Sequence, residues 1–192
     1  MNFDRKRFFD GYRSQFSKLT QGQVAGLETL LGFIEADQFL TDIRRVSYML
    51  ATIKHEADDK YEPIEEYGKG KGKKYGRADP VTGLVYYGRG YTQTTWKENY
   101  LKLSVAWNKL HPHEEVDFVA HPELLLVPRY SYFGTSYAMR VGLYTGRKLS
   151  DYINENFCNY FQARRIINIL DEAELIAGHA VKFERVLGAS SV

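Results

Sequence analysis

Apolar side chains recur at helical spacing through the first third of the chain and predict three helices. The first covers residues 3–16, and the second follows the capping-box pattern formed by Thr20 and Gln23. The third carries one apolar stripe whose members lie four and three residues apart: Phe39, Ile43, Val46, Leu50 and Ile53. This stripe leads directly into Glu56.

The helical pattern stops after Pro63. Residues 67–76 combine glycine with lysine and tyrosine, which is typical of an exposed loop. Residues 84–87, Leu-Val-Tyr-Tyr, predict a short strand in a small hairpin. A helix is expected again from Thr94 to about Leu110.

Three more helical patterns follow a proline-containing loop region. The last is the clearest, because Asp171 and Glu174 form a cap signal at its start and Gly188 stands where a C-terminal cap belongs. The chain as a whole has the pattern of one mainly α domain with a glycine- and tyrosine-rich insertion in its middle.

The charge balance excludes some classes of function. The chain holds 26 Lys and Arg against 24 Asp and Glu, a net charge of +2, which argues against binding nucleic acid or an anionic membrane through bulk charge. No apolar run approaches the ~18–20 residues of a membrane span, and no apolar segment follows the basic residues near Met1. We therefore expect neither a membrane helix nor a signal peptide. The single cysteine, Cys158, cannot form an internal disulfide, so we expect folding in a reducing compartment.

Tyrosine and glycine are concentrated in residues 61–100, which hold seven of the 15 tyrosines and seven of the 16 glycines. Tyrosine offers a flat apolar face with a hydroxyl group, and glycine lets the backbone approach a ligand closely. This combination indicates a cleft rather than a core.

Glu56 is the first candidate for chemistry. It lies at the margin of the third apolar stripe, and a carboxyl group partly removed from water holds a proton more readily, as a general acid requires. The alternative is a solvated glutamate paired with Lys60 four residues later.

A second acidic site follows Pro63, at Glu65 and Glu66. Adjacent residues of an extended segment point in opposite directions, so at most one of the two faces the same space as Glu56. Two carboxyl groups across a cleft suit hydrolysis of a glycosidic bond, with inversion at a separation of ~6.5–9.5 Å and retention at ~5–5.5 Å. The sequence does not set this distance.

The third feature is the segment YYGRGYTQTTWKENY, residues 86–100. Its glycines flank an arginine, but neither the lysine of a phosphate loop nor the acidic residue of a dinucleotide site follows at the required spacing. The segment resembles the YYGRGxxQxTWxxNY signature of family 19 chitinases and the related phage endolysins. The upstream AxxKHEA and PIEEYGKGKGKKYG resemble the segments that carry that family's two catalytic glutamates. The likeness continues in VDFVAHPELLLVP, YTGRKLSDYI and ARRIIN, and so extends from about residue 45 to the end.

The resemblance implies a lysozyme-like, mainly α domain over residues 1–192, with a small β-hairpin and a Gly-Tyr-rich loop lining a cleft. Within it we expect N-terminal helices over 1–40, the catalytic core over 41–110 and C-terminal helices over 111–192. The implied function is an endolysin-like glycoside hydrolase that cleaves β-1,4 bonds of peptidoglycan, or of chitin as the second choice, by an inverting mechanism with two carboxyl groups. The alternative is a non-catalytic wall- or glycan-binding protein, or a virion structural protein, that keeps the fold.

The resemblance also implies roles for single residues. Glu56 matches the general acid. The general base is Glu65 if nine residues are counted from the first glutamate, and Glu66 if the PIxEYG pattern is aligned; we favour Glu66 and keep both. Thr95 matches the residue that holds the attacking water. Substrate-binding roles are implied for six further residues: Tyr87, Arg89, Gln93, Asn99, Arg165 and Asn168.

Two positions depart from the family pattern, because Ile169 replaces a glycine and Leu143 replaces a common tryptophan. The histidines at 111, 113 and 121 lack the spacing of a metal site, so we expect no metal and no cofactor. The expected partner is the polysaccharide substrate, with neither nucleic acid nor membrane, and the expected state is a monomer. The endolysin type implies the host bacterial cytoplasm, and access to the wall through a separate permeabilising protein.

Overall fold

Seven α-helices, four short 3-10 helices and one two-stranded sheet make up the fold in the computed structural model, which describes residues 1–192. The predicted mainly α class is therefore confirmed. The chain forms two compact units, Met1–Tyr61 with Ser136–Val192, and Glu62–Thr135. Helix α5 (Pro128–Val141) contains the residue boundary between them.

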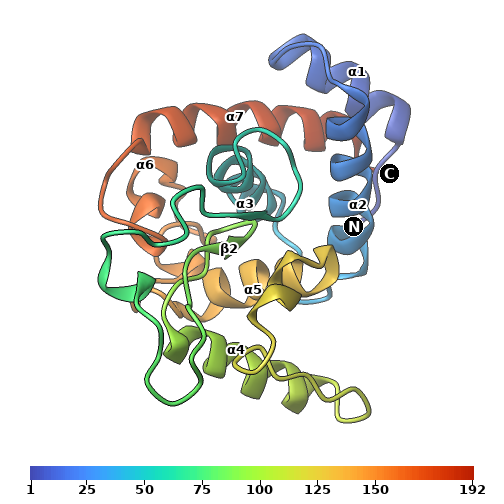
Figure 1. Cartoon of the computed structure of the whole chain (residues 1–192). Coiled ribbons are helices and arrows are strands. Elements are labelled where there is room, and N and C mark those ends of the chain that lie inside the picture. The colour runs from blue at the N-terminus through green and yellow to red at the C-terminus, as the bar shows by residue number, and fades with distance from the viewer. The chain divides into compact units, whose positions relative to one another are not determined.

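The first unit is helical, and α7 packs against α3, α1 and α6 (Figure 1). The apolar stripe of α3 is buried at Val46, Leu50 and Ile53, and α7 buries Ile176 and Phe183. The helices of this unit, apart from α5, are α1 (Arg5–Gln15), α2 (Gln21–Ala36), α3 (Ile43–Glu56), α6 (Tyr160–Ala163) and α7 (Ala173–Ser190), with the 3-10 turns η3 (Leu149–Asp151) and η4 (Arg164–Ile166).

The N-terminal helices begin at polar caps. The predicted capping box is confirmed, because Thr20 accepts a hydrogen bond from the Gln23 backbone and the Gln23 side chain accepts one from the Thr20 backbone. Helix α3 begins after Asp42, whose carboxylate caps the Arg44 N–H, rather than near Phe39 as the periodicity predicts. Phe39 is 61% exposed, so it does not belong to the buried stripe.

The predicted caps of the last helix are wrong. Glu172, not Asp171, occupies the N-cap position, in a left-handed conformation and without a side-chain cap. The helix also continues through Gly188 to Ser190. Ser190 is buried and its hydroxyl donates to the Val186 carbonyl, so the last turn is held in place where a glycine signal alone would end the helix.

The chain leaves α3 by a tightly constrained route. Asp58, Asp59 and Tyr61 all have positive φ angles, of 52°, 58° and 56°. Tyr61 is fully buried, and its hydroxyl lies 2.7 Å from the hydroxyl of Tyr12. Gly26 of α2 faces it so closely that a Cβ atom there would lie 2.5 Å from the Tyr61 carbonyl oxygen.

The second unit contains β1 (Ile64–Glu65), η1 (Lys74–Gly76), β2 (Arg89–Gly90), α4 (Lys97–Leu110) and η2 (Pro122–Leu126). Strand β1 pairs antiparallel with β2, with Glu65 opposite Arg89. Helix α4 begins three residues later than predicted, because Trp96 has a φ angle of 70° and ends the preceding turn.

The strand predicted at residues 84–87 is wrong, since this segment has no regular structure. Residues 84–87 are held by side-chain contacts and single backbone hydrogen bonds, not by the regular hydrogen bonds of a β-sheet. The Tyr86 hydroxyl donates to the Val119 carbonyl at 2.9 Å, and the Trp96 N–H donates to the Tyr86 carbonyl at 3.0 Å. The apolar residues of this segment, which predicted a strand, therefore bury side chains without forming one.

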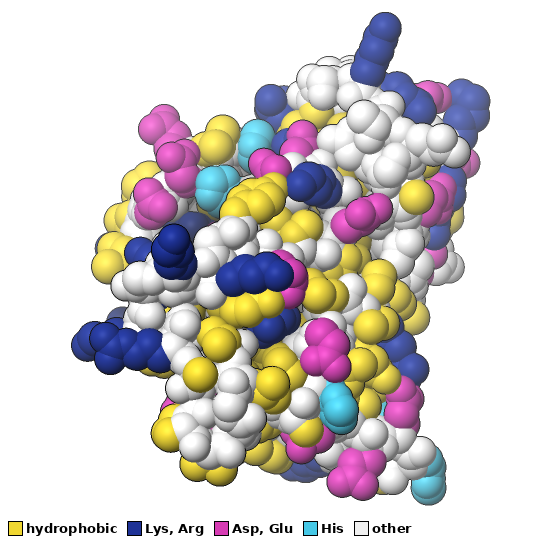
Figure 2. Space-filling model, in the orientation of Figure 1, with side chains coloured by type: hydrophobic (Ala, Val, Ile, Leu, Met, Phe, Trp, Pro, Cys, Tyr) yellow, Lys and Arg dark blue, Asp and Glu magenta, His cyan; other side chains and the backbone are white.

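Acidic and basic side chains are interspersed on the face of the molecule shown in Figure 2. No helix combines the length and the apolar character needed to cross a membrane. No three His, Cys, Asp or Glu side chains of residues 1–192 form a group that could hold a metal ion.

Candidate active site

Glu56 is the last residue of α3, and the helix places it beside a buried stripe. Ile53 and Ala57 are fully buried, whereas the Glu56 side chain is 18% exposed. Its Oε1 lies 2.6 Å from Nη1 of Arg164. The alternative pairing with Lys60 does not occur in the structure, where Lys60 pairs with Asp58 at 3.5 Å. Glu56 is therefore a partly buried carboxyl group with one defined cationic partner.

Arg164, which begins η4, is a residue that the sequence analysis missed. Its side chain is only 3% exposed, and its Nε donates to the Asp171 carbonyl at 2.8 Å. The backbone contact orients the guanidinium so that Nη1 reaches Glu56. A buried arginine requires a partner, but the sequence does not indicate which residue of the Arg164-Arg165 pair is buried.

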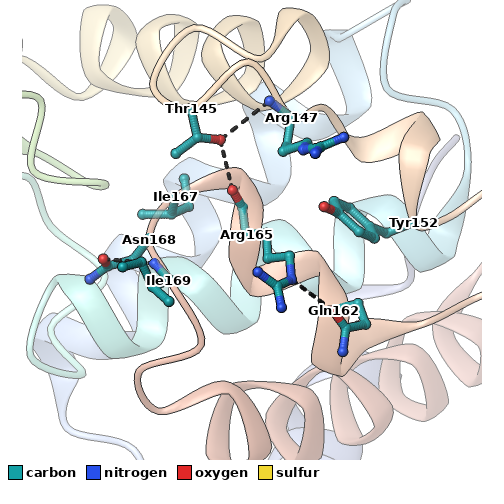
Figure 3. A pocket seen from close by; sticks show the side chains of 8 residues that line it. All are labelled: Thr145, Arg147, Tyr152, Gln162, Arg165, Ile167, Asn168 and Ile169. Carbon is teal, nitrogen blue, oxygen red and sulfur yellow. Dashed lines mark hydrogen bonds between the residues drawn. The ribbon is translucent and has the colours of Figure 1, made fainter.

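Arg165 and Asn168 lie on a pocket of the first unit, shown in Figure 3. Both side chains are exposed. The Arg165 Nε donates to Oε1 of Gln162 at 2.8 Å, and Oδ1 of Asn168 accepts the Ile169 N–H at 2.8 Å. Consecutive arginines thus have different surroundings, since Arg164 pairs with Glu56 and Arg165 lines the pocket.

Glu65 is the last residue of β1, and Glu66 follows it directly. Glu65 stands opposite Arg89 in the pairing register, and the Glu66 N–H donates to the Gly88 carbonyl at 2.7 Å. Because side chains alternate along an extended strand, the two carboxylates have separate surroundings.

The Glu65 carboxylate is held by three neighbours. The Tyr87 hydroxyl donates to Oε1 at 2.5 Å, Lys69 Nζ lies 3.1 Å from Oε2, and Arg89 Nε lies 3.7 Å from Oε1. The Arg89 guanidinium also stacks 3.7 Å from the centre of the Tyr87 ring. The Tyr87 hydrogen bond, followed by Lys69 and Arg89, lowers the pKa of Glu65 below its ordinary value. Tyr87 and Arg89 thus hold Glu65 in its ionised form.

Glu66 has two neutral hydrogen-bond donors. The Tyr75 hydroxyl donates to Oε1 at 3.0 Å and the Gly88 N–H donates to Oε2 at 3.1 Å. A Cβ atom at Gly88 would lie 2.8 Å from Oε1 of Gln93 and 3.3 Å from Cβ of Glu66, so both side chains crowd the same glycine. The Tyr75 ring meets the ring of Trp96 edge-on at 5.6 Å, and Trp96 is 44% exposed.

The polar residues after β2 are fixed by backbone contacts. Gln93 donates from Nε2 to the carbonyls of Ile64 and Gly90 at 3.1 and 3.0 Å, which turns its amide toward β1 and β2. Asn99 donates from Nδ2 to the Thr95 carbonyl at 2.9 Å. These contacts place Gln93 at the Glu66 side of Gly88 and fix the turn that carries Thr95.

The ten predicted site residues fall into two groups, one in each unit. The first unit holds Glu56, Arg165 and Asn168. The second unit holds Glu65, Glu66, Tyr87, Arg89, Gln93, Thr95 and Asn99. The sequence missed Arg164 and also Tyr75, which falls in the segment predicted as an exposed loop but hydrogen-bonds to Glu66.

No protein-family model matches the sequence, and none of the curated proteins does. Solved structures do share its fold. Chitinase C from Streptomyces griseus HUT6037 is 18% identical with a TM-score of 0.64, covering 98% of this chain and 78% of that one. A bacterial family 19 chitinase is 17% identical with a TM-score of 0.56, covering 97% and 95%. A mutant of chitinase C is 16% identical with a TM-score of 0.53, covering 97% and 92%. The chain therefore has the mainly helical fold of family 19 chitinases.

Proposed function

We propose that the protein is a glycoside hydrolase that cleaves β-1,4 bonds in an N-acetylhexosamine polymer, with Glu56 as general acid. The observation that carries this proposal is the fixed, partly buried position of Glu56 at the end of α3, where its side chain is 18% exposed and its Oε1 lies 2.6 Å from Arg164. Removing two charges from water is costly, and the Arg164 side chain is only 3% exposed. A partly buried, fixed carboxyl group at a sequence position that resembles a catalytic glutamate is a candidate for chemistry. The shared fold supports the same reading, since the similar structures are chitinases.

We further propose Glu66 rather than Glu65 as the general base. The Glu65 carboxylate already contacts a lysine, an arginine and a tyrosine, which stabilise its charge and oppose proton uptake. The Glu66 carboxylate contacts only neutral donors, and Gln93 lies on its side of Gly88. Thr94 exchanges two backbone hydrogen bonds with Arg89, which fixes the turn that contains the neighbouring Thr95.

The proposed reaction uses these groups in one inverting step. Glu56 gives its proton to the glycosidic oxygen as the bond to the anomeric carbon breaks. Glu66 takes a proton from a water molecule that attacks the opposite face of the sugar ring, and Thr95 holds this water. One carboxyl group loses a proton and the other gains one, so the pair is restored by exchange with solvent.

Peptidoglycan is the substrate that we propose, with chitin as the second candidate. The proposal follows the resemblance to small endolysins, as does the proposed location in a bacterial cytoplasm, with a separate permeabilising protein giving access to the wall. Mass analysis of the fragments released from purified sacculi tests the reaction. Fragments with reducing ends support hydrolysis, anhydro-sugar ends indicate a transglycosylase, and peptide release indicates an amidase. Binding to sacculi without fragments would establish the alternative of a wall-binding protein.

A further inference from the structure

The pocket in Figure 3 has chemistry that cleavage of a neutral glycan does not require. Its volume of about 520 Å³ is within the range of small-ligand sites, and all its lining residues belong to the first unit. Tyr152 is flanked by Arg147 on one side and by Arg165 with Gln162 on the other.

The pocket is cationic without an internal counter-charge. Two arginines and no acidic residue line it, and neither Arg147 nor Arg165 takes part in an ion pair. Arg165 uses its Nε on Gln162, which leaves both terminal nitrogens of the guanidinium available. The neighbouring Arg164, in contrast, is neutralised by Glu56.

The backbone segments that line the pocket are fixed, although the side chains of Arg147 and Arg165 are exposed. The Thr145 hydroxyl donates to the carbonyl of Arg165 at 2.7 Å and accepts the Arg147 N–H at 3.3 Å, so one side chain ties together the segments that carry both arginines. Asn168 uses Oδ1 on the Ile169 N–H and keeps its amide nitrogen as a donor. The pocket therefore presents mostly donors, and two of them are charged.

We propose that this pocket binds a carboxylate that the glycan carries as a substituent. Guanidinium groups bind carboxylates through paired, charge-assisted hydrogen bonds. Chitin has hydroxyl and acetamido groups but no carboxylate, whereas a muramic acid residue carries a lactyl carboxylate or, through it, a peptide with carboxylates of its own. The inference rests on the proposed function and makes it specific, because it assigns the preference for peptidoglycan to Arg147 and Arg165.

The test compares three glycans of equal length: peptide-bearing peptidoglycan strands, the same strands freed of peptide, and N-acetylglucosamine oligomers. Arg147→Gln and Arg165→Gln each remove one charge from the pocket. Arg185→Gln is the matched control, because Arg185 is exposed on α7 and does not line the pocket. We expect the ratio of kcat/KM on a carboxylate-bearing strand to kcat/KM on the oligomer to fall about 10-fold in each pocket variant, as for loss of one charged hydrogen bond. The control should keep the wild-type ratio.

The strand that shows the loss identifies the source of the carboxylate. If the kcat/KM ratio falls only for peptide-bearing strands, the pocket binds a peptide carboxylate. If it falls only for peptide-free strands, the pocket binds the lactyl carboxylate. An unchanged ratio in both pocket variants would overturn the inference. If the wild type cleaves none of the three glycans, the proposed function fails, and calorimetric binding of a soluble muropeptide still decides the inference. Binding that is lost in Arg165→Gln but kept in Arg185→Gln supports it, and absence of binding refutes it.

Discussion

At the scale of single residues, Glu56 and Arg164 define each other's surroundings. The carboxylate at the end of α3 is mostly buried, the guanidinium is almost fully buried, and they lie 2.6 Å apart. Removal of either partner leaves a charge that has lost both water and its counter-charge. The pair therefore links the stability of the first unit to the geometry of the proposed acid.

Arg164→Met is expected to lower the free energy of unfolding by about 3–5 kcal/mol, because it leaves Glu56 partly buried and unpaired. Arg165→Met makes the same chemical change at an exposed position and is expected to change stability by less than about 0.5 kcal/mol. Urea unfolding of both variants measures the difference. Equal effects would show that the ion pair has no special role in the fold.

Glu56→Gln is expected to reduce turnover by a factor of about 10² to 10⁴, since an amide cannot supply a proton. The amide oxygen can still accept a hydrogen bond from Arg164, so the helical circular dichroism spectrum should be unchanged. Release of reducing ends from the substrate is the measurement. Activity within a few-fold of wild type would remove Glu56 from the mechanism.

The neighbouring residues Glu65 and Glu66 are expected to respond differently to the same substitution. Glu66→Gln should lower turnover by about 10²-fold or more if Glu66 activates water, whereas Glu65→Gln should cost less than about 10-fold. Glu65 is the matched control, because it directly precedes Glu66 in the chain and its carboxylate has different partners. The reverse order of effects would assign the base to Glu65.

At the scale of elements, close packing between α2 and Tyr61 determines how the chain leaves α3. Gly26 has no room for a side chain, while Gly32 of the same helix has no heavy atom within 4 Å of its Cβ position. Gly26 and Gly32 therefore have different surroundings, since Gly26 makes a buried contact and Gly32 faces open space.

Gly26→Ala is expected to destabilise the protein by about 1–3 kcal/mol, because its methyl group would overlap the backbone of Tyr61. Gly32→Ala is expected to stabilise it by up to about 1 kcal/mol through helix propensity. Thermal unfolding of the two variants should shift in opposite directions. A stabilised Gly26→Ala variant would show that this contact is looser than described.

Helix positions could be predicted from the sequence because each helix repeats its signal over several turns. The stripe of α3 and the capping box of α2 are examples. The pairing of β1 with β2 could not be predicted from the sequence, since strands of two residues provide no periodicity. In addition, Arg89 lies 24 residues after Glu65 in the sequence. The same limit applies to Arg164, whose contact with Glu56 spans 108 residues. The sequence motifs located the candidate residues, and the structure shows which side chains each one contacts.

At the scale of the whole molecule, stability should depend on acidic groups that are ionised in the folded state. The Lys97 hydrogen bond, supported by the Thr82 and Val81 backbone, lowers the pKa of Asp79 to about 2. A carboxylate whose folded pKa is lowered stabilises the fold above its unfolded pKa, and this contribution is lost as the pH falls through the folded pKa. For Asp79 the loss is expected between its ordinary value of 3.8 and about 2.

Asp79→Asn is therefore expected to be less stable than the wild type at neutral pH. The difference in free energy of unfolding should shrink as the pH falls from about 4 to about 2, because the wild type loses its ion pair with Lys97 over that range. Urea titrations at several pH values measure the difference. A difference in the free energy of unfolding that stays constant with pH would mean that the contact between Asp79 and Lys97 does not stabilise the fold.

The sequence separation of the Glu56–Arg164 contact has a consequence for the order in which a nascent chain can acquire activity. Glu56 leaves the ribosome more than a hundred residues before its counter-charge does, since their contact spans 108 positions. Residues 62–135 form a contiguous unit that can fold during synthesis, while the unit containing Glu56 must wait for the segment that begins at Ser136. A chain released early, even one carrying every residue of the YYGRG segment, would hold the proposed acid without the group that fixes it. Synthesis of the segment that carries Arg164 would then be the event that fixes the proposed acid in place.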